Sequence, residues 1–212
     1  MIFYIKAAVI ILTVVLFSAA SYYVYDWRRT ATFLRNLPGE IVFNQRDGNN
    51  LNVYTISADG KNKKLVFANN DKTNSNSISP KWNEDKSKIR FAAMKDGKWQ
   101  TFVVNPDGSD LQILNVEHDT VSRNTSSGEI RVERGSLYVR ESDGRETLLY
   151  SLRSVPGYDP VFNSGASEAG WSPDKQYVVF ESCAFSFCGI MIADRTGENI
   201  VKLTDGTKPD WK

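Results

Sequence analysis

The sequence predicts an all-β fold, a small β-propeller of about four blades, preceded by a single N-terminal transmembrane helix. A unit of strand, turn, strand, turn and strand recurs at a spacing of roughly 35 to 55 residues, which is typical of propeller blades. Gly, Asn, Asp and Ser cluster at regular intervals, as expected where short strands are joined by turns. Residues 7–25 carry no charge and are mostly aliphatic, which is typical of a membrane span.

The segment 1–27 is predicted to be a membrane anchor, followed by a stalk at 28–38 and the propeller at 39–212. Nineteen helical residues span about 28 Å, close to the hydrocarbon thickness of about 30 Å. The side chains expected at the membrane interface, around the C-terminal end of this span, are Tyr22, Tyr23, Tyr25, Trp27, Arg28 and Arg29. A signal peptide cleaved near Ser18-Ala19-Ala20 is the alternative.

Two opposing signals bear on which side of the membrane the soluble domain lies. The arginines that follow the span favour a cytoplasmic C-terminal side. The signal-like start and the two cysteines favour an oxidising compartment on the opposite side. We expect the domain to lie outside the cytoplasm.

Three clear copies of the repeated unit cover 39–67, 87–114 and 176–203, and a weaker copy covers 130–149. Most copies place an Asp-Gly pair before the last strand, because these residues tolerate the positive φ of tight turns. The acidic turn at 105–110 also invites comparison with a calcium loop, but it lacks the EF-hand spacing and the distal Glu. We therefore predict a turn there and not a metal site.

The C-terminal segment Pro209-Asp210-Trp211-Lys212 stops where another repeat would begin. We expect the strand at 40–43 to complete that blade, because blades built from both ends of a domain close a ring and remove its unpaired edges. Four repeats then form a four-bladed ring. The alternative is an incomplete ring that closes by self-association with a second copy or against a partner.

Cys183 and Cys188 are predicted to form a disulfide. The strands on either side should make a hairpin, and cysteines at its mouth would face each other with Cα atoms within roughly 4.4–6.8 Å. Two free, half-buried thiols are the alternative. The bridge would hold a loop with Phe185 and Phe187, which we predict as partner contacts. Packing of these two rings against the neighbouring blade is the alternative.

Three tryptophans recur at one place in the repeat and are predicted to pack between adjacent blades, each burying roughly 150–250 Å². They are Trp82, Trp171 and Trp211. Trp99 differs because it begins a strand, at what we expect to be a rim of the propeller. We predict that Trp99 contacts a partner.

The segments Trp82-Asn83-Glu84-Asp85-Lys86 and Trp171-Ser172-Pro173-Asp174-Lys175 resemble the TolB-type propeller repeat, whose consensus is similar to P-x-W-S-P-D-G-x-x-I-x-F. Both carry Lys where that consensus has Gly, and the third repeat has no such segment before Ile130. The resemblance covers about 170 residues. It implies a TolB-like fold that interacts with envelope proteins, so with the anchor we expect a single-pass protein of the bacterial inner membrane with its domain in the periplasm.

No catalytic, cofactor or metal site is predicted. The 26 Lys and Arg residues balance 25 Asp and Glu residues, which argues against nucleic-acid binding. The single His118 leaves little material for a catalytic triad or for a metal site with the cysteines. We predict a non-enzymatic scaffold for protein interaction, an accessory or stabilising subunit of an inner-membrane complex. A small-molecule or glycan binding module and a secreted soluble propeller are the alternatives.

Overall fold

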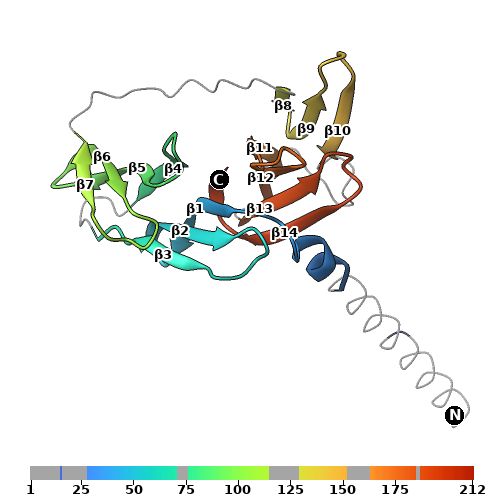
Figure 1. Ribbon diagram of the computed structural model, residues 1–212. Helices are drawn as coiled ribbons and strands as arrows, with labels where there is room; N and C mark the ends of the chain where they lie inside the picture. The colour runs from blue at the N-terminus through green and yellow to red at the C-terminus, as the bar shows by residue number, and fades with distance from the viewer. Residues whose placement is uncertain (1–14, 16–27, 71–75, 115–128, 152–162, 185–186) are drawn as a thin grey trace, which may run out of the picture. The chain divides into compact units, whose positions relative to one another are not determined.

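Fifteen strands in four antiparallel sheets make up the described part of residues 38–212 (Figure 1). The computed structural model describes residues 15, 28–70, 76–114, 129–151, 163–184 and 187–212. In chain order the strands are β1 (Glu40–Asp47), β2 (Asn50–Ser57), β3 (Lys64–Phe67), β4 (Ser77–Trp82), β5 (Ile89–Lys95), β6 (Lys98–Val104), β7 (Gln112–Leu114), β8 (Glu129–Glu133), β9 (Ser136–Arg140), β10 (Glu146–Ser151), β11 (Asn163–Trp171), β12 (Tyr177–Ala184), β13 (Phe187–Asp194), β14 (Ile200–Asp205) and β15 (Thr207–Trp211).

The chain divides into two compact units, Met1–Leu37 and Pro38–Lys212. In the first unit, residues 28–34 are helical, with Arg28 and Arg29 exposed. Within the described residues, no helix has the length and apolar character needed to cross a membrane. All but one residue of the predicted anchor lies outside the described residues, and so do four of its predicted interface residues, Tyr22, Tyr23, Tyr25 and Trp27.

Sheet 1 has the strand order β15-β1-β2-β3, so the first and last strands of the second unit lie side by side. Ile41 pairs with Trp211, and the backbones of Glu40 and Lys212 exchange hydrogen bonds of 3.0 and 3.3 Å. This pairing confirms the predicted completion of the terminal sheet by a strand from the other end. It also protects one edge of β1 with a strand distant in sequence.

Sheet 2 (β4-β5-β6-β7) and sheet 4 (β11-β12-β13-β14) are four-stranded antiparallel meanders, the arrangement found in propeller blades. Sheet 3 has the order β10-β9-β8 and contains three strands among the described residues. It corresponds to the weak third repeat. Its first hairpin turns at Arg134 and Gly135, whose φ values of 50° and 75° suit a tight two-residue turn.

Two hydrophobic clusters join the sheets in pairs. One joins sheets 1 and 2, where the rings of Phe91 and Phe102 stack with centroids 5.5 Å apart. The other joins sheets 3 and 4, because Leu137 and Val139 of β9 are buried in the same cluster as Phe180 of β12. Each sheet therefore depends on a neighbour for part of its core.

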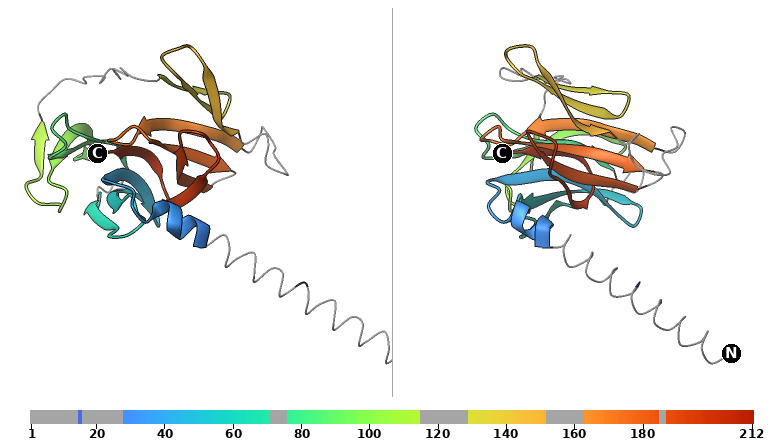
Figure 2. Two further views of the ribbon diagram at one scale, coloured as in Figure 1. Left: turned by 45° about the vertical axis from the view of Figure 1, so that its right-hand side comes forward. Right: turned by 90° about the vertical axis from the view of Figure 1, so that its right-hand side faces the viewer.

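Contacts among the described residues give the sequence of neighbouring sheets. β1 and β15 lie against β4, β15 also lies against β11 and β12, and β11 lies against β8 and β9 (Figure 2). The order is therefore sheet 2, sheet 1, sheet 4, sheet 3. Between the described strands of sheets 2 and 3 there is no extensive contact, so closure into a ring stays a prediction.

The three repeated tryptophans lie near junctions between sheets. Trp82 is buried in the cluster of sheets 1 and 2, and its backbone N–H donates to Oδ2 of Asp210 at 2.8 Å. Trp211 is buried and its indole N–H donates to the carbonyl of Pro38 at 2.8 Å. Trp171 is partly buried against the cluster of sheets 3 and 4. These placements suit side chains that pack between blades.

The two Trp-containing segments form matching turns. Asn83 Oδ1 and Ser172 Oγ each accept the backbone N–H of the residue five positions later, at 2.9 and 3.0 Å. Lys86 and Lys175, which stand where the TolB-type consensus has Gly, have φ values of 60° and 57°. A non-glycine residue in this conformation costs about 1–2 kcal/mol. The turn is thus formed by local hydrogen bonds despite the unfavourable residue.

In the acidic turn at 105–110, the Asp107 carboxylate forms hydrogen bonds within the turn itself. Oδ1 of Asp107 accepts the hydroxyl and the backbone N–H of Ser109, at 2.6 and 2.9 Å, and these bonds hold the pKa of Asp107 below its ordinary value. Gly108 has a φ of 86°, which only glycine adopts without strain. This geometry is that of the predicted turn.

Candidate functional site

β12 and β13 form a hairpin in continuous register that ends with Ala184 opposite Phe187. Cys183 and Cys188 are direct partners one pair earlier, and their sulfur atoms are bonded at 2.03 Å, which confirms the predicted disulfide. The Cα atoms are 4.1 Å apart, slightly closer than expected. A separation this short is typical of the non-hydrogen-bonded pairs of an antiparallel ladder, whose Cα atoms are about 4.5 Å apart.

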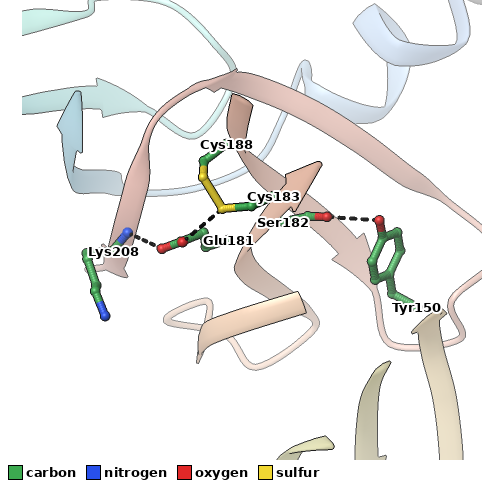
Figure 3. The surroundings of a disulfide bond; sticks show 6 residues. All are labelled: Tyr150, Glu181, Ser182, Cys183, Cys188 and Lys208. Carbon is green, nitrogen blue, oxygen red and sulfur yellow. Dashed lines mark hydrogen bonds between the residues drawn. A yellow bond between two sulfur atoms is a disulfide. The ribbon is translucent and has the colours of Figure 1, made fainter. Parts of the chain in front are cut away.

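Glu181 lies on the same face of β12 as Cys183, because it precedes it by two residues (Figure 3). Its side chain is buried, with 8% of the residue exposed. Oε2 accepts the backbone N–H of Lys208 at 2.8 Å, and Oε1 lies 3.1 Å from Sγ of Cys183. One carboxylate thus connects the disulfide hairpin to β15.

Ser182 faces the other side of β12. Its hydroxyl lies 2.9 Å from the hydroxyl of Tyr150 in β10 (Figure 3). The ring of Tyr150 also contacts Phe180, with centroids 5.0 Å apart. The strand that carries the disulfide is therefore held by β15 on one face and by sheet 3 on the other.

A cavity of about 560 Å³ lies beside the disulfide, within the usual size range of ligand sites. Its walls come from β1, the start of β2 and the turn between them, from the start of β13, and from the junction of β14 and β15. The lining residues are Asn44, Gln45, Arg46, Gly48, Leu51, Phe187, Cys188, Asp205, Gly206 and Thr207.

Two amide side chains in this lining have unused acceptor atoms. Asn44 is fully buried, and its Nδ2 donates to the carbonyl of Asn52 at 3.2 Å, whereas Oδ1 has no partner. Oε1 of Gln45 is also buried without a partner. Both oxygens have almost no exposed surface, so a ligand in the cavity could reach them only after neighbouring side chains move.

Gly206 allows the β14–β15 junction to lie over the disulfide hairpin. Its backbone N–H donates to the carbonyl of Cys188 at 3.1 Å. A Cβ at Gly206 would come within 2.5 Å of the Phe43 ring. A larger residue would therefore push the junction away and change the cavity wall.

The predicted partner contacts fall on different sheets. Phe187 begins β13 on sheet 4 and is 79% exposed at the cavity. Trp99 of β6 on sheet 2 pairs with Met94 and is 46% exposed. Phe185 lies outside the described residues. The structure therefore links Phe187, and not Trp99, to the cavity.

A second cavity of about 650 Å³ lies at the turns of sheets 3 and 4 and includes Glu141 and Arg195. Nε of Arg195 donates to Oε1 of Glu141 at 2.9 Å, and Nη2 donates to Oε2. The hydrogen bond from Arg195 lowers the pKa of the Glu141 carboxyl. Because these two charges satisfy each other, this cavity is the weaker candidate for a ligand site.

Glu181, Cys183 and Cys188 also form a group of possible metal ligands, with ligand atoms within 4.8 Å of one another. The two sulfurs are bonded to each other, so in this oxidised state neither offers a thiolate to a metal. The group is thus a disulfide with an adjacent carboxylate.

Sequence reasoning missed Glu181 and Asn44. A charged residue inside an apolar strand, two positions before a cysteine, was the available signal for Glu181. Asn44 follows an apolar run and carries no comparable signal, because half of the cavity lining, from Phe187 to Thr207, comes from a distant part of the chain.

No family model matches the sequence, and no curated protein matches it. Two solved structures to which the chain is similar are a putative TolB from Agrobacterium tumefaciens and TolB from Acinetobacter baumannii, each at 13% sequence identity. The TM-scores are 0.31 and 0.30, over 80% and 79% of this chain and 64% and 53% of those chains. The chain thus spans less than two thirds of the length of either. At this level of similarity, the description of the fold rests on the strand pairing.

Proposed function

We propose that this protein is a non-enzymatic, membrane-anchored scaffold for protein interaction, an accessory or stabilising subunit of a bacterial inner-membrane complex with its β domain on the periplasmic face. The uncharged segment 7–25 supports the anchor. The Cys183–Cys188 disulfide supports an oxidising compartment. Exposed aromatic side chains on sheets 2 and 4 support a role in binding partners.

The observation that carries this proposal is the exposed ring of Phe187. The ring is 79% exposed, although its neighbour Cys188 is fixed by the disulfide. Aromatic residues are enriched in protein interfaces, and a side chain on a rigid hairpin loses little freedom when it binds. The adjacent cavity gives a partner side chain a place to enter beside the ring.

Purification of the full-length protein from native membranes in a mild detergent tests this proposal, with mass spectrometry of the co-purifying proteins and of the N-terminus. We expect an intact Met1 and a membrane protein in stoichiometric amount. Phe187→Ser should lower recovery of that protein about tenfold. Leu148→Ser, which removes another exposed apolar side chain, is the control. The absence of a stoichiometric partner, or equal losses in both variants, would contradict the proposal.

A small-molecule or glycan binding module is the second candidate function. The polar residues Arg46, Asp205 and Thr207 in the cavity lining favour it, because such side chains form hydrogen bonds with sugar hydroxyls. A rise in melting temperature with one member of a saccharide panel, abolished by Asp205→Ala, would support this function. An N-terminus at Ser21 without membrane partners would indicate a secreted soluble protein instead.

A further inference from the structure

One oxygen of the Glu181 carboxylate faces a sulfur atom that has no hydrogen to donate. Oε1 lies 3.1 Å from Sγ of Cys183, whereas Oε2 accepts the backbone N–H of Lys208 at 2.8 Å (Figure 3). A disulfide sulfur carries no proton, so the contact at Oε1 is not a hydrogen bond in the oxidised state. Glu181 is buried, and a buried charged acceptor that lacks a donor is costly.

Reduction of the disulfide would change this contact. The thiol of Cys183 would carry an S–H that can donate to Oε1, and hydrogen bonds to ionised acceptors are stronger than those between neutral groups. The surroundings of the sulfur therefore favour the dithiol over the disulfide. We propose that Cys183–Cys188 is an exchangeable disulfide that accepts two electrons from an external dithiol, and that Glu181 stabilises the reduced pair.

Cys188 lines the cavity beside the exposed Phe187, so we place the approach of the reductant on this side of the disulfide. A thiolate of the reductant attacks Sγ of Cys188, and the bond between Cys188 and Cys183 breaks. The released sulfur of Cys183 takes a proton from the second thiol of the reductant and then donates a hydrogen bond to Glu181. The second thiolate then attacks the first sulfur of the reductant and displaces the Cys188 sulfur, which takes up the proton lost by the first thiol. Two electrons and two protons are transferred, and the reductant becomes a disulfide.

The hairpin is held by more than the cross-link. β12 pairs with β13 on one edge and with β11 on the other. The cysteines are separated by five positions, and a cross-link that closes so short a loop restricts the unfolded chain less than one that closes a long loop. We expect the domain to keep its fold when the disulfide is reduced. This inference is independent of the membrane anchor and of the proposed partner.

The experiment equilibrates the full-length protein in detergent with glutathione buffers of increasing reduced fraction. Free thiols are then counted by alkylation and mass spectrometry. Disulfides with a purely structural role resist reduction by glutathione, whereas we expect Cys183–Cys188 to become reduced. Glu181→Gln keeps the shape of the side chain but removes its charge, and its amide can face the sulfur. We expect it to lower the equilibrium constant for reduction about tenfold, which corresponds to about 30 mV.

Glu168→Gln is the matched control, because it removes a carboxylate that pairs with Nζ of Lys208 at 2.7 Å. Glu168→Gln should leave the reduction equilibrium unchanged. Circular dichroism checks the fold of each variant. If Glu181→Gln does not fold, Glu181→Asp replaces it, because the shorter side chain withdraws the carboxylate from the sulfur and should also disfavour reduction. A wild-type disulfide that stays oxidised in excess glutathione overturns the proposal, and so does a folded Glu181 variant that is reduced as readily as the wild type.

Discussion

Sheets 3 and 4 arise from copies of one repeat, yet they are built differently. Sheet 4 has the Trp171 segment between β11 and β12, contains four strands and carries a disulfide at the end of its central hairpin. Sheet 3 lacks such a segment, has three strands among the described residues and turns tightly at Arg134 and Gly135. The two sheets nevertheless share one hydrophobic cluster. The difference shows how a shortened repeat can still complete a core.

The short hairpin of sheet 3 lies directly against the backbone of β11. The carbonyl of Gly135 accepts the N–H of Ala166 in β11 at 2.9 Å. A Cβ at Gly165, whose φ is 69°, would lie 2.4 Å from that carbonyl oxygen. Backbone meets backbone at this point, so a side chain on β11 would have no space. Sheet 3 thus depends on sheet 4 for both a polar contact and its core.

The largest effect is expected from Leu137→Ala, which tests whether sheet 3 depends on the shared cluster. Leu137 is fully buried there, so we expect a loss of about 3–4 kcal/mol in the free energy of unfolding. Urea denaturation measures this loss, and hydrogen exchange should show that β8 to β10 lose protection before β12 and β13. The exposed Val132→Ala is the control. Equal loss of protection in both sheets would contradict this dependence.

Gly165→Ala tests the backbone contact between the two sheets. We expect a loss of about 2–3 kcal/mol, because the new methyl group meets the Gly135 backbone and the positive φ becomes strained. Gly48→Ala is a matched control, since Gly48 has a φ of 58° but nothing within 4 Å of its Cβ position. It should cost only about 1 kcal/mol. If the two substitutions had equal costs in urea denaturation, the close contact would have no energetic role.

Lys175→Gly tests the turn that sheet 4 has and the described part of sheet 3 lacks. Glycine removes the strain at a φ of 57° but adds freedom to the unfolded chain. We expect a net gain of about 0.5 kcal/mol in thermal or urea denaturation. Lys86→Gly, in the matching turn of sheet 2, should act in the same direction. A loss of stability in both variants would show that the lysine side chains contribute more than the strain costs.

The smallest effect is expected from the ion pair between the turns of sheets 3 and 4. The hydrogen bond from Arg195 lowers the pKa of Glu141 from its ordinary value of 4.5. A carboxyl with a lowered folded-state pKa contributes stability above its unfolded pKa and loses it as pH falls. The stability of the wild type should therefore fall more between about pH 5 and about pH 3 than that of Glu141→Gln. Parallel pH profiles would contradict a role for this pair.

Features set by residues close in sequence were predicted better than contacts between distant segments. The repeat unit, the Asp-Gly turns and the disulfide were predicted correctly, because each depends on residues close in sequence. The pairing of β15 with β1 was also predicted, because Pro209-Asp210-Trp211 resembles the segments that begin other repeats. Glu181 beside the sulfur was missed, although its position two residues before Cys183 places both on one face.

The sequence by itself determined the local elements of this protein. Strand alternation, turn residues and the spacing of Cys183 and Cys188 act within one hairpin, where geometry follows from a few dihedral angles. Only the tertiary structure decided that Lys208 reaches Glu181, that Gly135 lies on β11, and that a cavity forms beside the disulfide. These contacts depend on how twisted sheets pack against each other. Side-chain periodicity identifies which face is buried, but it does not specify which distant segment will cover it.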